Sequence, residues 1–453
     1  MSNENLQVKT GYADIWRISW PIMLSSLANT VINFTDTAFL GRVGETELAA
    51  SAIGGVYYFV LVMMGVAIGI GAQIMIARLA GENRPAEIGS IFDHSVVLLL
   101  LLAAVMVSFC YMAMPSLIFK IISDTTVAKA VIVYLNARSW GLFPMMILVA
   151  TRCLYVGIGH TRIVGYTTVL MMVLNFILGY LLAFGHAGFP AWGIYGVGLA
   201  SAFSETAAAA YAILYAMLRK PLQQFRLFKF KNIQLPVFSK MMYLSAPIVL
   251  QNFISMGAWF VFFVLIEKMG QHALAISNVV RTIYMLLMTP LWGFSQAANT
   301  MVSNIIGQQK NDEVMPLTGR IMVLGFLTSL VAVIFVAIYP EAVLNLITTN
   351  SSIIQDARTT IYIICAATLL ISVGLILLSA VSGTGDTRAA MFIEILNISA
   401  YLAFVIICTQ FIKTSVEVVW LSEIQYWSLM ALFSYFYLRS NRWRARIGSA
   451  ELN

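Results

Sequence analysis

The chain has 453 residues, of which 60% are hydrophobic and 10% are charged, and its formal net charge is +7. Soluble domains are about 45–50% apolar and about 25% charged, and a single water-soluble core stops growing at about 250–300 residues. The composition therefore excludes a soluble globule, a disordered chain and a disulfide framework. It predicts a membrane protein with several spans.

Twelve apolar runs, each long enough to cross a bilayer as a helix, follow one another along the chain. The run at 95–114, for example, contains no charged residue. The expected fold class is an all-α polytopic membrane protein with twelve transmembrane helices. The predicted spans are 15–39, 49–77, 92–118, 131–157, 163–185, 191–218, 242–266, 274–304, 318–339, 358–381, 388–412 and 418–438.

Lysine and arginine are divided unevenly between the two sides of the membrane. With both termini in the cytoplasm, the inside segments hold eighteen of these residues, Lys231 and Arg446 among them, and the outside loops hold six. Basic residues accumulate on the cytoplasmic side, so we expect a multi-pass protein of the cell (inner) membrane with both termini cytoplasmic. The basic stretch 219–241 is expected to be a cytoplasmic linker, either as an orientation signal or as a site for anionic lipid.

The two halves of the chain resemble each other. A displacement of 226 residues places Pro21 on Pro247 and the segment 157–162 on 383–388. Each half then holds six spans, an even number, so both halves insert the same way up. We expect two six-helix pseudo-symmetric bundles around a central cavity.

These bundles define the expected domains. They are an N-terminal lobe (1–218), the linker, and a C-terminal lobe with a basic cytoplasmic tail (242–453). Pro21 and Pro247 lie early in the first span of each lobe, where proline removes a backbone donor and can bend the helix. Each is either a functional hinge or a static kink.

Asp36 lies in the outer half of the first span, beside Asn33, Thr35 and Thr37. Ionisable residues within a span are costly and are functional candidates by default. A carboxylate there can gain and lose a proton, or it can help to ligate a sodium ion. The structural alternative is a helix cap. Asn33 is expected to face the substrate cavity.

Glu205 falls near the middle of the sixth span and is a second ion-coupling candidate. Arg152 could pair with it, in which case the two would form a structural ion pair. Asn175 in the fifth span can hydrogen-bond an acid across the bundle. Arg138 and Arg281 lie near span ends and are expected to snorkel to the membrane surface.

The second half differs at the position equivalent to Asp36, which is Phe262. The seventh span offers the neutral groups Gln251, Asn252 and Ser255 as candidates for the substrate cavity. We therefore expect the ion-handling chemistry to be concentrated in the N-terminal half. Two further acids within spans, Glu394 and Glu423, have no partner that the sequence makes evident.

The sequence lacks the motifs typical of metal binding, nucleotide binding and hydrolytic catalysis. The four cysteines and four histidines show no metal-ligand spacing, and no Gly-Lys-Ser/Thr phosphate loop, His-Glu-x-x-His or Gly-x-Ser-x-Gly pattern occurs. We expect no metal, no cofactor, no nucleic-acid partner and no enzymatic activity. The 24 methionines and 12% aromatic residues favour an adaptable, apolar cavity that accepts aromatic cations.

Several of these motifs together resemble the multidrug and toxic compound extrusion (MATE) transporters. They are Pro21 with Asp36-Thr-Ala-Phe-Leu-Gly41, Gly157-Ile-Gly-His-Thr-Arg162 and its partner Gly383-Thr-Gly-Asp-Thr-Arg388, and Pro290-Leu-Trp-Gly-Phe-Ser-Gln-Ala, followed by Gly307-Gln308. The resemblance covers about residues 10–440.

This resemblance implies a secondary antiporter that exports organic cations or amphipathic drugs by alternating access. The family's essential aspartate corresponds to Asp36, and its span-5 asparagine corresponds to Asn175. The second aspartate of some members would fall at Gly179, and the C-lobe glutamate of sodium-coupled members would fall at Ser255. Their absence favours proton coupling, as in the DinF-like branch, and we expect a monomer.

Three alternatives remain open within transporters. A sodium-coupled drug antiporter would use the same carboxylate for a different ion. A lipid-linked oligosaccharide flippase of the same superfamily often has fourteen spans and a cationic cavity, unlike this chain. A major facilitator porter would carry a different charged motif after its second span than Arg78-Leu-Ala-Gly-Glu-Asn-Arg-Pro-Ala.

Overall fold

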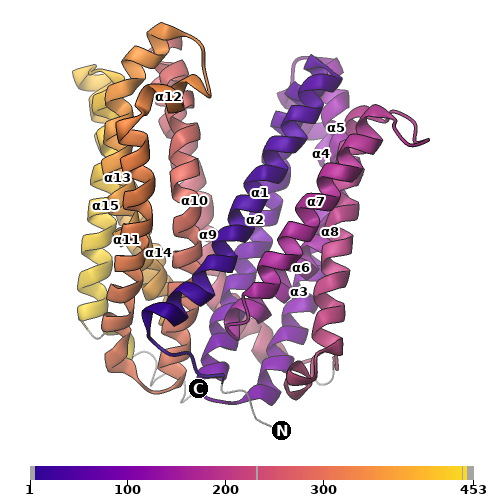
Figure 1. Cartoon of the computed structure of the whole chain (residues 1–453), viewed down its shortest axis with the longest axis vertical. Coiled ribbons are helices and arrows are strands. Elements are labelled where there is room, and N and C mark those ends of the chain that lie inside the picture. Colours follow the sequence, from indigo (N-terminus) through magenta and orange to yellow (C-terminus); the bar gives the residue numbers. More distant parts are fainter. Residues whose placement is uncertain (1–5, 231–232, 441, 446–453) are drawn as a thin grey trace. The chain divides into compact units, whose positions relative to one another are not determined.

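The structure is a computed structural model and describes residues 6–230, 233–440 and 442–445 (Figure 1). Lys231 and Arg446, counted among the inside basic residues, lie outside the described residues. The described chain is helical almost throughout. The long helices are α1 (Tyr12–Val43), α2 (Glu45–Gly81), α3 (Pro85–Met112), α5 (Thr125–Ser139), α6 (Leu142–Gly157), α7 (Arg162–Phe184), α8 (Gly193–Leu218), α9 (Leu235–Glu267), α10 (Gln271–Gly307), α11 (Val314–Ile338), α13 (Ser351–Gly383), α14 (Thr387–Ile406) and α15 (Val416–Arg439).

Shorter elements join the long helices. They are α4 (Met114–Ile121), α12 (Pro340–Asn345), the 3-10 turns η1 (Lys220–Phe225) and η2 (Asn311–Glu313), and η3 (Ile407–Ile412). The last of these is a turn of π-helix that ends the eleventh span. The predicted linker is therefore helical in part, because η1 lies near its start and α9 already begins at Leu235.

The predicted spans match these helices. In the described part of the chain, nine helices are long and apolar enough to cross a membrane, and α5 with α6 makes a tenth span bent by 51°. The helices α1 and α15, 32 and 24 residues long, are not in this count. With them, and with α5 and α6 counted once, the long helices of the described residues number twelve. The all-α, twelve-helix membrane fold is thus confirmed. The bend at Trp140 and Gly141 is a feature that the hydropathy pattern did not predict.

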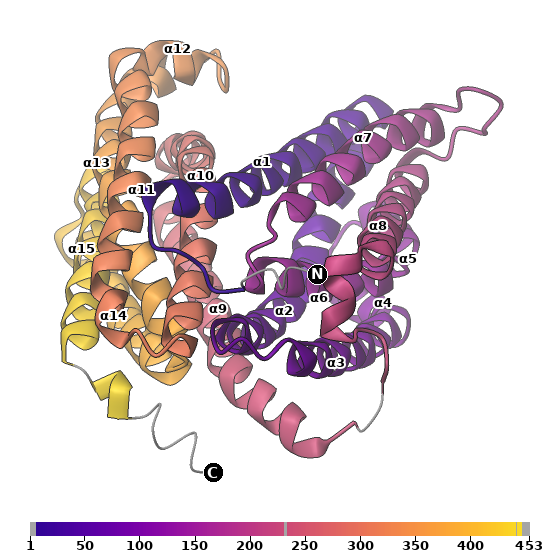
Figure 2. The ribbon, with the colours of Figure 1, turned by 60° about the horizontal axis from the view of Figure 1, so that its bottom comes forward.

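The chain forms two compact units. The body of the first is Leu24–Ser245, and the second combines Gln7–Met23 with the described residues from Ala246 onward. The chain passes from one unit to the other inside α1, just after Pro21, and again inside α9, just before Pro247. In the first unit, α2 packs against α3, α5 and α6, and α7 packs against α8. In the second, α13 packs against α10, α11 and α15 (Figure 2).

The same close packing of two helices occurs inside each unit. A Cβ atom added to Gly157 at the end of α6 would lie 3.3 Å from the carbonyl oxygen of Gln73 on α2. At the equivalent Gly383, it would lie 2.6 Å from the carbonyl oxygen of Asn299 on α10. Gln73 and Asn299 are themselves equivalent under the 226-residue displacement, so the sequence repeat corresponds to repeated packing.

The linker is held against α3. The Asp93 carboxylate accepts hydrogen bonds from the backbone N–H groups of residues 228–230 at 2.8–2.9 Å. His94 Nε2 accepts from the backbone N–H of Gln234 at 2.9 Å, while its Nδ1 lies 2.6 Å from the carbonyl oxygen of Ser90. These partners require a neutral imidazole with its proton on Nδ1.

Candidate functional site

Six buried polar or charged side chains from five helices meet within the first unit. We call them the N-terminal acid cluster. Each is less than one-tenth exposed. The members are Asp36 on α1, Tyr58 on α2, Arg138 on α5, Asn175 on α7, and Ser201 and Glu205 on α8. Ser201 and Glu205 are four residues apart, so they share one face of α8.

Two glycines bring α8 close to the bent α5–α6 pair. A Cβ atom on Gly198 would lie 2.9 Å from the Cβ of Ala137. A Cβ atom on Gly141, at the bend, would lie 3.2 Å from the Cα of Ala202 and 2.3 Å from Glu205 Oε2. The absence of side chains at these points lets Arg138, just before the bend, reach the carboxylate of Glu205.

At one end of the cluster, a serine hydroxyl binds Asp36. Ser201 Oγ donates to Asp36 Oδ2 at 3.2 Å, and Asn175 Nδ2 donates to Ser201 Oγ at 3.0 Å. The other carboxylate oxygen, Oδ1, is buried without a hydrogen-bond partner among the described residues, as is Asn175 Oδ1. The site therefore presents acceptor oxygens that protein donors leave unmet.

At the other end, Glu205 is held by a cation and a phenol. Tyr58 Oη lies 3.2 and 3.1 Å from the two carboxylate oxygens, and Arg138 Nη2 lies 3.4 Å from Oε1. The guanidinium carbon of Arg138 also sits 4.2 Å from the centre of the Tyr58 ring, which is a cation–π contact. Both carboxylate oxygens of Glu205 are thus satisfied.

The cluster contains two acids and one base. Arg138 interacts electrostatically with Asp36 as well as with Glu205. A single guanidinium can balance only one carboxylate, and an unbalanced charge inside a membrane is costly. The cluster is neutral when one acid, and only one, carries a proton. Asp36 is the acid with an oxygen available for it.

The structure brings together the three predicted ion-coupling residues, Asp36, Asn175 and Glu205. The proposed pairing of Glu205 with Arg152 is wrong, because Arg138 is its cationic partner. Arg152 lies about three turns beyond the bend along α6. The expectation that Arg138 snorkels is also wrong, since Arg138 is buried and its guanidinium faces the cluster.

Sequence reasoning missed Tyr58. The signal that could have found it is the repeat, because the displacement of 226 residues places Tyr58 on Tyr284. A tyrosine at the same point of both halves, within otherwise apolar helices, suggests a shared hydrogen-bonding role. Tyr284 does donate a hydrogen bond to a buried acid, Glu423, at 2.6 Å.

The predicted cavity residues lie in separate units. Asn33 in the first unit is exposed, one turn before Asp36. Gln251, Asn252 and Ser255 in the second unit are half-buried on α9. Ser255 Oγ lies 2.6 Å from Glu394 Oε1, so at least this residue contacts an acid. Their role in binding substrate stays a prediction.

The acids of the second unit do have partners, contrary to the expectation from sequence. Glu394 Oε1 accepts from Ser255 and from Tyr426, each at 2.6 Å. Glu423 accepts from Tyr284, from Tyr401 at 3.2 Å and from Trp427 Nε1 at 3.2 Å. Within the described ranges, no group of three or more His, Cys, Asp or Glu side chains is placed to hold a metal ion.

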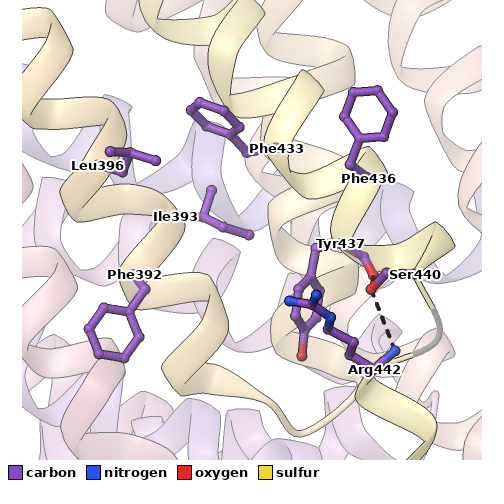
Figure 3. A pocket seen from close by; sticks show the side chains of 8 residues that line it. All are labelled: Phe392, Ile393, Leu396, Phe433, Phe436, Tyr437, Ser440 and Arg442. Carbon is purple, nitrogen blue, oxygen red and sulfur yellow. Dashed lines mark hydrogen bonds between the residues drawn. The ribbon is translucent and has the colours of Figure 1, made fainter.

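A shallow groove of about 420 Å³ also lies on the second unit, between α14 and α15 (Figure 3). Its walls are mainly apolar, and none of the predicted site residues lines it. The lining residues are Phe392, Ile393, Leu396, Phe433, Phe436, Tyr437, Ser440 and Arg442.

Comparison with known proteins decides the family. The family profile described as MatE matches residues 21–181 and 247–409, which together exceed half of the chain. This chain belongs to the MatE family. The profile matches once in each half, beginning at Pro21 and at the equivalent Pro247, in agreement with the repeat.

Relatives extend the MatE resemblance over most of the sequence. The chain is 25% identical over 332 residues to a probable multidrug resistance protein NorM of Synechocystis sp., covering 73% of this chain and 72% of the relative. It is 22% identical over 443 residues to the NorM relative of Thermotoga maritima, covering 96% and 93%. The family predicted from the motifs is confirmed. Its assignment to the DinF-like branch stays a prediction.

The fold is that of solved MatE transporters. A structure described as the outward-facing conformation of a multidrug resistance MATE family transporter of the MOP superfamily superposes with a TM-score of 0.90 at 18% identity, covering 98% of this chain and 99% of that one. This MatE chain therefore shares the fold of that transporter, and its long apolar helices make it a multi-pass membrane protein.

Proposed function

We propose that this protein exports organic cations or other amphipathic drugs in exchange for protons, and that Asp36 carries the coupling proton. The NorM relatives, named as probable multidrug resistance proteins, support the substrate class. One observation supports the proton site above all others. Asp36 is a buried acid with one carboxylate oxygen unpartnered among the described residues, in a cluster of two acids and one base.

The exchange follows from charge balance in the cluster. When Asp36 is ionised, Arg138 faces two carboxylates, and the cluster carries a net negative charge that can attract a cationic drug. A proton entering from outside binds to Asp36 Oδ1 and removes that charge. Drug and proton then compete for one lobe, so each lowers the affinity for the other.

Pro21 is the proposed hinge for this response, with Pro247 as its counterpart. Each proline deprives its helix of one backbone donor, and each lies where its helix passes between the two compact units. Protonation of Asp36 on α1 changes its bond to Ser201 on α8. We propose that α1 then bends near Pro21 as the two lobes alternate access.

Sodium coupling is the second candidate, and a specific feature favours it. The unmet oxygens of Asp36 and Asn175 are ligands that a small cation accepts. Arg138 argues against it, because a fixed positive charge beside the carboxylates repels a second cation. A proton can instead be carried on the acid itself. We accordingly favour the proton.

The proposed setting is a cell (inner) membrane, with both termini cytoplasmic and the protein acting as a monomer. The basic linker and tail support this orientation through the positive-inside rule. The chain needs no metal or cofactor for the proposed exchange, because the two opposing ligands drive it.

Efflux of a fluorescent organic cation from proteoliposomes tests the proposal. An imposed proton gradient should drive efflux in the wild type and fail to do so in Asp36→Asn. Asp312→Asn is the matched control, since Asp312 is exposed and pairs only with Arg444 among the described residues. Efflux driven by sodium alone would assign the other ion. If neither gradient moves the dye, the drug-export proposal fails, and lipid-linked oligosaccharides are the next substrates to test.

A further inference from the structure

The second unit contains an acid centre of its own between α14 and α15, with contributions from α9 and α10. We call it the C-terminal acid centre. It contains Ser255, Tyr284, Glu394, Tyr401, Glu423, Tyr426 and Trp427. Its two carboxylates are each 3% exposed. No ion pair of either acid occurs in the described part of the chain.

Glu423 corresponds to Glu205 of the first unit. Both glutamates follow a serine in the last helix of their half, and both accept a hydrogen bond from the tyrosine that the repeat conserves, Tyr58 or Tyr284. The displacement here is shorter than in the earlier spans, because Glu423 lies seven residues after the start of α15, whereas Glu205 lies twelve residues after the start of α8.

Glu423 is the fully bonded acid of its centre. Its Oε2 accepts hydrogen bonds from Tyr284 and Trp427, and its Oε1 accepts one from Tyr401. Neutral donors thus replace the arginine that holds Glu205. Each unit therefore contains one acid whose two oxygens are both occupied.

Glu394 is the acid of this centre with only one of its two carboxylate oxygens hydrogen-bonded. Both of its donors, Ser255 and Tyr426, bind the same oxygen, Oε1, and Oε2 is buried without a partner among the described residues. Asp36 shows this pattern in the first unit, where a serine hydroxyl binds one oxygen and the other is bare. One bonded acid and one half-bare acid thus occur in each unit.

We infer that Glu394 is a second proton-binding residue, which takes its proton on Oε2 and returns it to water during the transport cycle. The titratable groups near it are the phenols of Tyr426, Tyr401 and Tyr284 and the carboxyl of Glu423, none of which supplies a positive charge. A buried carboxylate without a cation is costly in a membrane, and a proton removes that charge. This inference rests on the proposed exchange and extends it to a second proton in each cycle.

Infrared difference spectroscopy between high and low pH tests the site without any drug. The wild type should show two protonated-carboxyl bands that titrate and shift in deuterium oxide. One should be lost in Asp36→Asn, and the other, the Glu394 band, should be abolished by Glu394→Gln. Glu423→Gln, the matched change at the fully bonded acid, should retain it. Tyr426→Phe removes one donor from Oε1 and should shift the band without deleting it. Loss of the band only in Glu423→Gln, or an unchanged spectrum in Glu394→Gln, would overturn the inference.

A second proton site should also change the number of protons exchanged for each dye molecule. This ratio is obtained from the proton gradient that just halts net dye movement. The wild type should move one proton more per dye molecule than Glu394→Gln, which should still exchange through Asp36. An equal ratio in both proteins would refute the second proton. If dye is not exchanged for protons at all, the proposed function fails, while the infrared result still decides whether Glu394 binds a proton. A band that responds to sodium at constant pH would assign a different ion to the centre.

Discussion

The guanidinium of Arg138 lies 3.4 Å from the carboxylate of Glu205, with both side chains buried inside the first unit. Removing one partner of a buried pair leaves an uncompensated charge and typically costs about 3–5 kcal/mol. We therefore expect Arg138→Met to lower the thermal unfolding midpoint in detergent strongly. The double variant Arg138→Met/Glu205→Gln should recover most of the loss.

Arg358→Met is the control for this pair, because Arg358 makes an exposed ion pair with Glu341. Exposed ion pairs typically contribute only about 0.2–1 kcal/mol to stability. Its unfolding midpoint should stay close to that of the wild type. A double variant as unstable as the single Arg138→Met would show that the arginine stabilises the unit through packing rather than through Glu205.

The close approach at Gly141 makes a second prediction. A methyl group there would meet Glu205 Oε2 at 2.3 Å and the carbonyl oxygen of Arg138 at 3.0 Å. Overpacking of this kind costs about 1–3 kcal/mol, so Gly141→Ala should destabilise the protein and reduce dye efflux. Gly55→Ala, on α2 with nothing within 4 Å of the added Cβ, should be neutral or slightly stabilising in the same thermal assay. Equal effects of the two substitutions would contradict the packing described at the bend.

Ser201 connects Asn175 to Asp36, so its hydroxyl should matter for transport. Ser201→Ala removes the hydroxyl that donates to Asp36 Oδ2, and a hydrogen bond to a charged group contributes about 1.5–3 kcal/mol. We expect proton-driven efflux to fall on the order of tenfold, with normal amounts of protein in the membrane. Thr206→Val is the control on the same helix, because the Thr206 hydroxyl bonds only its own helix, at Ala202 O. Wild-type efflux in Ser201→Ala would remove Ser201 from the mechanism.

Asp93 fixes the linker through three backbone N–H groups. Asp93→Ala should release this segment and raise the rate of trypsin cleavage after Lys229 several-fold. Glu87→Ala alters an exposed acid on the same helix, paired with Arg84, and should leave the cleavage rate unchanged. If the linker is cut equally fast in both variants, the anchoring role assigned to Asp93 is incorrect.

The sequence predicts the fold well because the physical signal is long and local. A run of about 20 apolar residues marks each span, and such runs located all twelve. The bend between α5 and α6 escaped prediction, since Trp140 and Gly141 barely interrupt the hydropathy. That bend places Arg138 beside α8. The position of Arg138 along the span therefore could not show that its side chain is buried against Glu205.

The candidate site was predictable residue by residue but not as a set of contacts. Asp36, Glu205 and Asn175 stand out because polar groups are expensive within spans. The partners of these residues depend on which helix faces pack together. Small residues such as Gly198 determine that packing. For this reason the sequence offers Arg152, in span 4 of the same half, as a partner for Glu205, and it does not reveal the donors to Glu394 and Glu423.

The central claim is an obligatory exchange of drug for protons through Asp36. The most direct measurement uses proteoliposomes that contain a trapped pH indicator and no initial pH gradient, to which an organic cation is added on one side. Movement of the cation should drive protons the opposite way, so the indicator should report a pH change in the wild type and in Asp312→Asn but none in Asp36→Asn. Cation movement without any pH change, or an unchanged signal in Asp36→Asn, would contradict the account.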